Sequence, residues 1–337
     1  MISAGSIDLR RLFPVRPARA GVRWLVSLIL LVTLLTAFWA CGIFSAEEFA
    51  QAPSPAGPAL FFSVIIAYIV PIFGYISERT AAAVDALGPL LDETAEQHAA
   101  WCRRIYVKPR LWLLTVLGIA IAAGLAHNLL LFGSLDPLLL VRSPSAATSA
   151  IAWGTMLVWS TVTFVIAALL DNALLLNRLA GRVRVQPFHP ISLRPFATVA
   201  VISTLALIGA QAAFPIMTIE DDMNPAAYLP GLIATGIPML LIAALPVWPV
   251  HRQLAAAKRE LLADVNARIA ALPLPDAARP ESIVALTQLL AYRREVMQIS
   301  EWPFDVGVMT RLALYLIIPP LTWVGAALIE NLVDAFL

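Results

Sequence analysis

Long apolar runs alternate with short polar segments along most of this chain. Seven of the runs are long enough to cross the ~30 Å hydrocarbon core of a bilayer, which takes about 20 residues of α-helix. The pattern therefore predicts an all-α polytopic membrane protein, a bundle of seven transmembrane helices. The predicted spans are Trp24–Phe44, Ala59–Ile76, Leu111–Phe132, Ala150–Leu176, Phe196–Met217, Leu229–Trp248 and Phe304–Leu337.

The polar segment 77–110, between the second and third spans, has the periodicity of an amphipathic helix. Its apolar residues recur every three or four positions, opposite a set of acidic side chains. Gly88-Pro89 should divide it into two helical pieces, because proline cannot continue the hydrogen-bond ladder. We expect both pieces to lie in the cytoplasm.

Residues 251–303 contain two amphipathic stretches separated by a proline-rich turn at 272–276. This pattern predicts an antiparallel helical hairpin that leads directly into the last span. Neither helix can bury its apolar stripe alone, so we expect the hairpin to pack on itself, on segment 77–110 or on a neighbouring subunit, as an oligomer anchor. The second stripe consists of Ile283, Leu286, Leu290 and Met297, and the expected anchor residues are Leu261, Val265, Leu286 and Leu290.

The positive charges predict the orientation of the bundle. If the N-terminus is cytoplasmic and the spans alternate, all of the 23 Lys and Arg residues except Arg142 lie inside. The positive-inside rule therefore predicts a cytoplasmic N-terminus and an external C-terminus. Residues 1–22 then form an irregular basic arm in the cytoplasm, and residues 23–250 form six transmembrane helices.

Composition narrows the class of protein further. Hydrophobic residues make up 60% of the chain and charged residues 13%, a balance that excludes a soluble globular domain. Arg far outnumbers Lys and Ala is abundant, which suggests a GC-rich bacterial gene and hence the bacterial inner membrane. The expected surroundings are the lipid bilayer and further copies of the chain, with inorganic cations or a small molecule as possible ligands and no nucleic acid.

Catalytic motifs are absent from the sequence. There is no zinc-protease, serine-hydrolase, phosphate-loop or dinucleotide-binding signature, and the 4 His residues are scattered over both predicted faces. We therefore predict no enzyme activity, no catalytic residue, no cofactor and no metal site shared by the histidines.

Three polar residues within the spans are candidate functional groups: Asp171, Asn172 and Gln211. An ionisable group inside a membrane is expensive to bury and therefore suggests a function. Asp171 lies near the predicted inner boundary, within reach of water, Asn172 or Arg178. Structural pairing and a gating or proton-transfer role both remain open for it.

The last span combines a proline pair with carboxylates at its predicted outer end. Pro319 and Pro320 lack backbone donors, so the carbonyls one turn earlier lose their partners in mid-membrane. Glu330 and Asp334 are four residues apart and therefore share a helix face. In a symmetric oligomer they would form acidic rings that favour cations. The pore and gate candidates are Tyr315, Pro319, Pro320, Trp323, Ala327, Glu330 and Asp334.

This arrangement of spans resembles the seven-helix ion-channel superfamily that contains insect odorant and gustatory receptors. The resemblance implies a tetrameric channel in which the last helix is split into an anchor half and a pore half. Pro280–Ser300 would match the anchor half and Gly307–Leu337 the pore half, although the Thr-Tyr and Gln-Phe pairs of the insect proteins are absent. We expect a homo-oligomeric ion channel; a secondary transporter and an accessory membrane subunit without transport activity are the alternatives.

Overall fold

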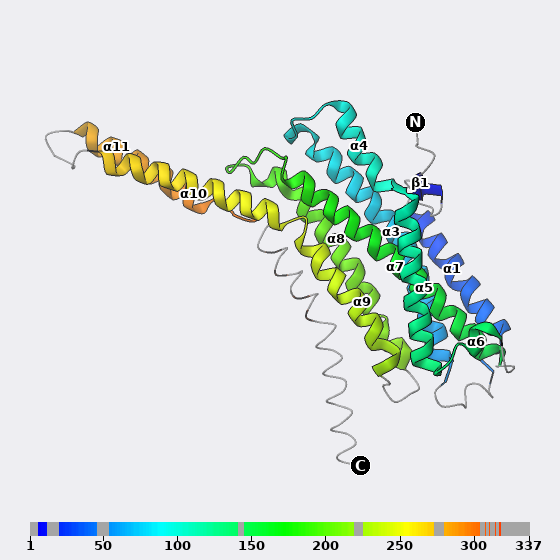
Figure 1. Cartoon of the computed structure of the whole chain (residues 1–337). Helices are drawn as coiled ribbons and strands as arrows, with labels where there is room; N and C mark the ends of the chain where they lie inside the picture. Colours follow the sequence, from blue (N-terminus) through cyan, green and yellow to red (C-terminus); the bar gives the residue numbers. More distant parts are fainter. Residues whose placement is uncertain are drawn as a thin grey trace, which may run out of the picture.

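The computed structural model describes residues 6–11, 20–45, 54–140, 145–218, 225–272 and 280–303, and the single positions 307, 310, 314 and 317. These residues are mostly helical, and the described part of the chain contains six helical segments long and apolar enough to cross a membrane (Figure 1). The prediction of an all-α membrane protein is confirmed. The seventh predicted span, Phe304–Leu337, falls outside the described residues except at those four positions.

Six long helices form the bundle and run in alternating directions between its two ends (Figure 1). The 23 residues of α5 rise about 34 Å at 1.5 Å per residue, enough to cross the hydrocarbon core of a bilayer. The bundle helices are α1 (Ala20–Ala40), α3 (Ala56–Leu87), α5 (Arg110–Phe132), α7 (Ala146–Ala180), α8 (Arg194–Gln211) and α9 (Pro225–Ala244).

The two ends of the bundle differ in charge. At one end, here called the basic end, α1 and α5 begin and α3 and α7 finish, among cations such as Arg23, Lys108 and Arg178. The basic end carries α4 (Ala95–Tyr106) and the short turns η2 (Gly88–Leu90) and η3 (Pro190–Leu193). The opposite end, here called the far end, carries α6 (Asp136–Leu139) and η4 (Phe214–Thr218).

Segment 77–110 differs in part from its prediction. Its first piece is no separate helix, because α3 continues without interruption through the predicted end of the span at Ile76. The expected break at Gly88-Pro89 is confirmed, since η2 separates α3 from α4 there. The helix then stops at Tyr106, and residues 107–109 are extended, as the residue before a proline prefers.

The N-terminal arm is more ordered than predicted over residues 6–11. Strand β1 (Ser6–Asp8) pairs in antiparallel fashion with β2 (Val107–Pro109), with Ile7 opposite Lys108. The turn η1 (Leu9–Arg11) follows, and Leu9 inserts into the main core with 1% of its surface exposed. The prediction of an irregular arm is therefore wrong for these residues, which cover the basic end of the bundle.

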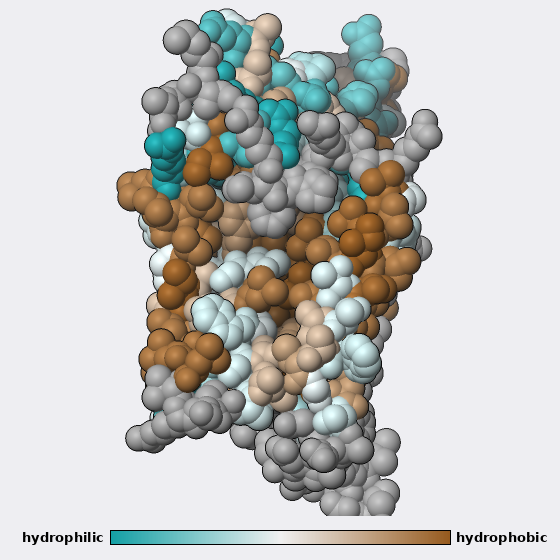
Figure 2. Space-filling model, turned by 90° about the vertical axis from the view of Figure 1, so that its right-hand side faces the viewer, coloured by the Kyte–Doolittle hydropathy of each residue, from teal (hydrophilic) through white to brown (hydrophobic). Residues whose placement is uncertain are grey.

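The core of the bundle is centred on α3, which packs against α1, α7 and α8. Its apolar side chains interdigitate with those of α7 and α8, and aromatic rings such as Phe73 and Phe164 meet edge to face at 5.9 Å. Outward-facing side chains are apolar as well: Figure 2 shows a hydrophobic band below a hydrophilic end. Exposed residues such as Leu28, Leu114 and Ile119 on α1 and α5 fit a lipid-facing surface.

The predicted hairpin is present and projects away from the bundle at the basic end (Figure 1). It consists of α10 (Trp248–Ala271), which follows α9 after a short turn, and α11 (Pro280–Gln298), which packs against α10. Arg293 of α11 donates a 2.9 Å hydrogen bond to Asn266 of α10.

The base of the hairpin consists of the start of α10, residues 248–258, and the residues after α11, 299–302. This region, here called the elbow, is fixed to the bundle through α10. Leu254 is fully buried in the core cluster at the basic end, and Gln253 donates to the carbonyl of Ala180 at 2.9 Å. The ring of His251 stacks on Trp302, with centroids 4.0 Å apart. The elbow therefore determines where the chain leaves α11 and enters the last apolar run.

Candidate ligand pocket

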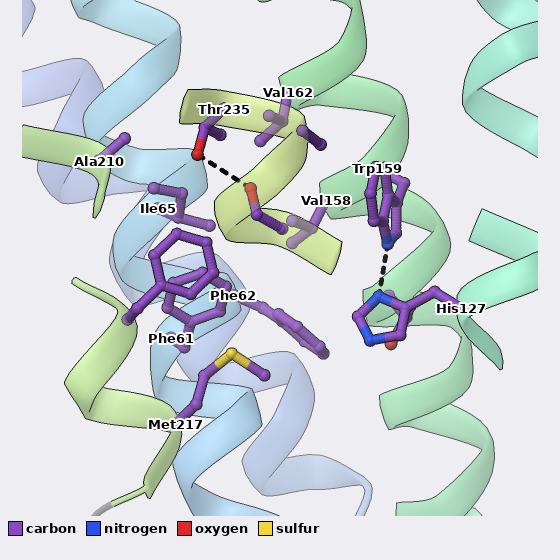
Figure 3. Close-up of a pocket in the computed structure, with 14 residues that line it drawn as sticks. Phe61, Phe62, Ile65, His127, Val158, Trp159, Val162, Ala210, Met217 and Thr235 are labelled. Carbon is purple, nitrogen blue, oxygen red and sulfur yellow. Dashed lines mark hydrogen bonds between the residues drawn. The ribbon is translucent and has the colours of Figure 1, made fainter. Parts of the chain in front are cut away.

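A small apolar cavity of about 40 Å³ lies inside the far-end half of the bundle (Figure 3). A cavity needs about 10–15 Å³ to hold one water molecule, so this one has room for a few small atoms or groups. Helices α3, α5, α7, α8 and α9 and the turn η4 all contribute to its wall. Small-molecule sites are usually apolar with a few convergent polar groups, as this cavity is, but they measure about 300–1,000 Å³ and are therefore much larger.

Aromatic side chains close much of the cavity, and glycines make room for them. A Cβ at Gly231 would lie 2.8 Å from the ring of Phe214, and one at Gly154 would lie 2.7 Å from the ring of Phe62. Either contact would force the aromatic ring to move, so both positions suit glycine. Phe61 packs against Phe214 with ring centroids 5.0 Å apart. The cavity wall is therefore densely packed, and a ligand larger than the cavity must displace side chains.

Two polar pairs face this region. The indole Nε1 of Trp159 on α7 donates a 2.6 Å hydrogen bond to Nδ1 of His127 on α5 (Figure 3). Because Nδ1 accepts, a neutral His127 ring carries its proton on Nε2. Gln211 on α8 donates from Nε2 to the hydroxyl of Thr235 on α9 at 3.1 Å, and Thr235 donates to a backbone carbonyl of its own helix. These groups could orient a ligand with one polar atom.

The predicted polar candidates lie in different places. Gln211 is buried and supports the cavity through Thr235. Asn172 is buried at the basic end of α7, and its Oδ1 has no hydrogen-bond partner among the described residues. Asp171 forms an ion pair with Lys108, so its expected partners, Asn172 and Arg178, are not the ones found.

The Lys108–Asp171 pair is unequally exposed to solvent. The side chain of Lys108 is only 2% exposed, whereas that of Asp171 is 40% exposed. The β1–β2 ladder turns Lys108 inward, and its ammonium also lies 5.8 Å from the ring centroid of Trp112. Burial lowers the pKa of Lys108, and the Asp171 carboxylate partly offsets that effect. The sequence alone does not reveal this pairing, because the partners are 63 residues apart in the chain.

The anchor candidates are only partly buried within one chain. Val265 is 1% exposed, Leu261 and Leu286 are half-buried, and Leu290 is 48% exposed. Helix α11 turns Val296, rather than Leu290, into the hairpin. The described chain therefore leaves part of the predicted second stripe uncovered.

The pore and gate candidates lie outside the described residues, and the structure does not test them. These are Tyr315, Pro319, Pro320, Trp323, Ala327, Glu330 and Asp334. Within the same run Gly307, Thr310, Leu314 and Ile317 are helical, and Leu314 and Ile317 are about half exposed.

The fold is that of an α-helical membrane protein with a small apolar cavity inside its bundle. No protein-family model, no curated protein and no solved structure matches the chain.

Proposed function

We propose that this chain is the subunit of a homo-oligomeric ion channel in the bacterial inner membrane, a relative of the superfamily that contains the insect chemoreceptors. In this proposal the basic end faces the cytoplasm, the α10–α11 hairpins hold the subunits together, and the last apolar run, residues 304–337, lines the pore. A small, mostly apolar ligand in the cavity regulates conduction.

The observation that carries the proposal is the uncovered face of α11. Ile283, Leu290 and Met297 are spaced seven residues apart and are each 44–52% exposed on a hairpin that projects from the bundle. A seven-residue apolar spacing keeps side chains on one face of a supercoiled helix, so it favours another helix as the partner.

A second copy of the chain is the partner that fits this face. α10 already covers another face of α11 through Val296, so the face with Ile283, Leu290 and Met297 stays available to a further helix, and a second hairpin offers a matching apolar face. Covering three half-exposed side chains contributes on the order of 3 kcal/mol per subunit at about 1 kcal/mol each.

The contacts of the elbow support placing the last apolar run around the central axis of the proposed oligomer. His251 stacks on Trp302, and Lys258 forms a 3.3 Å ion pair with Glu301, directly before that run begins. Hairpins held together around an axis would therefore also hold the start of each last run around the same axis. Glu330 and Asp334 would then concentrate cations at one mouth of the pore.

The cavity gives this channel a route for regulation. Gly231 and Thr235 in its wall belong to α9, which leads through a short turn into α10. A ligand that shifts α9 would shift the base of the hairpin. A ligand can shift the equilibrium between the closed and open states only by the difference between its binding free energies for these two states.

Purified protein in lipid nanodiscs tests assembly and conduction together. We expect the wild-type protein to form a ring of subunits. Leu290→Asp should dissociate this ring, because the introduced carboxylate would lose its hydration at the contact between subunits. Gln288→Asp, on an exposed position of the same helix, should leave assembly intact.

In planar bilayers, Glu330→Gln with Asp334→Asn should reduce cation-over-anion selectivity measured from reversal potentials. A monomeric wild-type protein, or selectivity unchanged in the double variant, contradicts the proposal.

Asp171 lies within the apolar helix α7 and pairs with the buried ammonium of Lys108, which favours one alternative, a secondary transporter. Ionisable groups within membrane-spanning helices occur in proton and ion relays. A transporter would move substrate without continuous current, so flux into liposomes without single-channel events would support it over the channel.

A further inference from the structure

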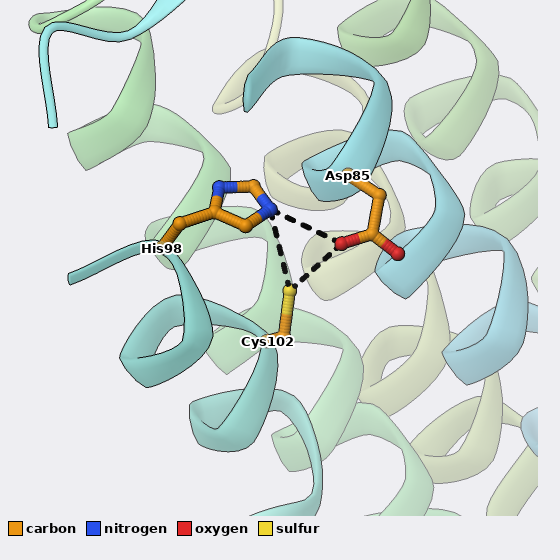
Figure 4. Close-up of side chains that lie close together, drawn as sticks. All are labelled: Asp85, His98 and Cys102. Carbon is orange, nitrogen blue, oxygen red and sulfur yellow. Dashed lines mark hydrogen bonds and ion pairs between the residues drawn. The ribbon is translucent and has the colours of Figure 1, made fainter. Parts of the chain in front are cut away.

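Three potential metal ligands meet where α3 and α4 pack together at the basic end (Figure 4). Asp85 lies near the end of α3, and His98 and Cys102 lie one turn apart on α4. His98 Nε2 is 3.1 Å from Asp85 Oδ1, Cys102 Sγ is 3.2 Å from the same oxygen, and Sγ is 3.9 Å from Nε2. The three side chains converge on one point from two helices.

Local structure places these side chains. A capping box between Thr94 and Gln97 starts α4 at Ala95, which puts His98 and Cys102 on the same face at i and i+4. Gly88, in the turn after α3, lets the imidazole approach, because a Cβ there would lie 3.2 Å from the ring carbon Cε1 of His98. Both features position the imidazole and the thiol toward Asp85.

We propose that Asp85, His98 and Cys102 bind one Zn²⁺ or a similar transition-metal ion at the junction of α3 and α4. Tetrahedral zinc has bonds of about 2.0–2.3 Å to oxygen, nitrogen and sulfur, which places its ligand atoms roughly 3.3–3.6 Å apart. The observed separations of 3.1, 3.2 and 3.9 Å need changes of only a few tenths of an ångström.

The donor set selects the class of ion. Thiolate and imidazole ligands suit zinc and other borderline or soft transition metals, whereas Mg²⁺ and Ca²⁺ prefer oxygen alone. Three protein ligands leave a fourth position for water. The side chain of Asp85 is 66% exposed, so the ion would exchange with the surrounding solution.

A nucleophilic cysteine is the competing interpretation, and the surroundings of the thiol oppose it. Burial and the adjoining Asp85 carboxylate raise the pKa of Cys102 to about 12. A nucleophilic cysteine needs the opposite shift. A bound cation would instead displace the thiol proton into the solvent and neutralise the carboxylate and the resulting thiolate together, and would join α4 to the central helix of the bundle.

Cobalt absorption in the tag-free, full-length protein in detergent tests the site. After chelator treatment, we expect Co²⁺ to bind at one ion per chain with a thiolate-to-metal charge-transfer band, and Zn²⁺ to displace it. The chain has only 2 cysteines, so Cys102→Ser should abolish the band while Cys41→Ser should keep it. His98→Gln and Asp85→Asn should each weaken binding at least ~10–100-fold, the loss seen when even a supporting residue is removed.

Asp92→Asn is the matched control for the carboxylate. Asp92 lies in the same segment but pairs with Arg184 at the surface, so its removal should not change cobalt affinity. Circular dichroism of the metal-free variants checks that each one folds. A wild-type protein without the charge-transfer band, or a band that survives in Cys102→Ser, overturns the proposal. These readouts are independent of oligomerisation and of current.

Discussion

The central helix of the bundle and the first helix of the hairpin both pack against neighbouring helices, yet they bury their residues to very different degrees. α3 buries 19 of its 32 residues, whereas α10 buries 3 of 24. α3 is surrounded by α1, α7 and α8, while α10 packs mainly on α11. The bundle therefore has a complete core within one chain, and the hairpin does not.

This difference separates two kinds of stability. Substitutions in the bundle should change the folding of a single chain, because its interior packs to native density. If the hairpins hold subunits together as proposed above, substitutions on the outer face of the hairpin should change assembly and leave the single chain folded. Substitutions on the inner face of the hairpin should have an intermediate effect, because this face holds α10 and α11 together away from the bundle.

The largest expected effect is in the bundle, at the Lys108–Asp171 pair. Asp171→Asn leaves the nearly buried ammonium of Lys108 without its counter-charge, and should lower the free energy of unfolding by about 3 kcal/mol, the low end for a broken buried pair. Lys108→Met should lower it by about 1 kcal/mol or less, because the 40%-exposed carboxylate can still be hydrated.

Unfolding of the two single variants and of the double variant in detergent measures this asymmetry. The double variant should recover most of the loss caused by Asp171→Asn, since no charge then remains buried. Equal effects of the two single substitutions would show that water reaches Lys108 as easily as Asp171.

Hydropathy alone predicts most of the bundle because its signal is local. Each transmembrane helix is a run of apolar residues, and the break at Gly88-Pro89 follows from the chemistry of proline. The β1–β2 pairing joins segments about 100 residues apart, and nothing in either short segment specifies the other. Long-range pairing of this kind requires the folded arrangement of the helices.

The candidate sites were harder to predict for the same reason. A uniformly apolar helix does not reveal its rotation, so the sequence alone could not identify Trp159 as the partner of His127. α11 has apolar residues on two adjacent faces, and periodicity could not decide whether Leu290 or Val296 faces α10. His98 and Cys102 carried a usable signal in their i, i+4 spacing, but Asp85 becomes visible only in the structure.

The second largest effect is expected inside the hairpin, where α10 and α11 pack against each other. Val296 is fully buried, so Val296→Asp places a charge between α10 and α11 and should destabilise the hairpin by roughly 2 kcal/mol or more. Limited proteolysis should then cut within residues 251–303, while the unfolding midpoint of the bundle changes little. Leu290→Asp, on the outer face, should leave the proteolysis pattern of the monomer unchanged. Equal protection of both variants would mean that α11 can rotate freely on α10.

The smallest effect compares two glycines within the bundle, where the same substitution should have opposite signs. At Gly154 an added Cβ would lie 2.7 Å from the ring of Phe62 and 3.1 Å from that of Phe38, so the packed rings must move. At Gly118 an added Cβ would meet no atom within 4 Å.

Gly154→Ala should therefore lower the free energy of unfolding by about 1 kcal/mol, because an overpacking penalty of about 1–3 kcal/mol outweighs the higher helix propensity of alanine. Gly118→Ala should raise it by up to about 1 kcal/mol, since only the propensity gain remains. Thermal unfolding of both variants in the same detergent shows directly whether each substitution raises or lowers stability. If Gly154→Ala is as stable as Gly118→Ala, the rings around the cavity are loose, and the cavity can admit larger ligands without distortion.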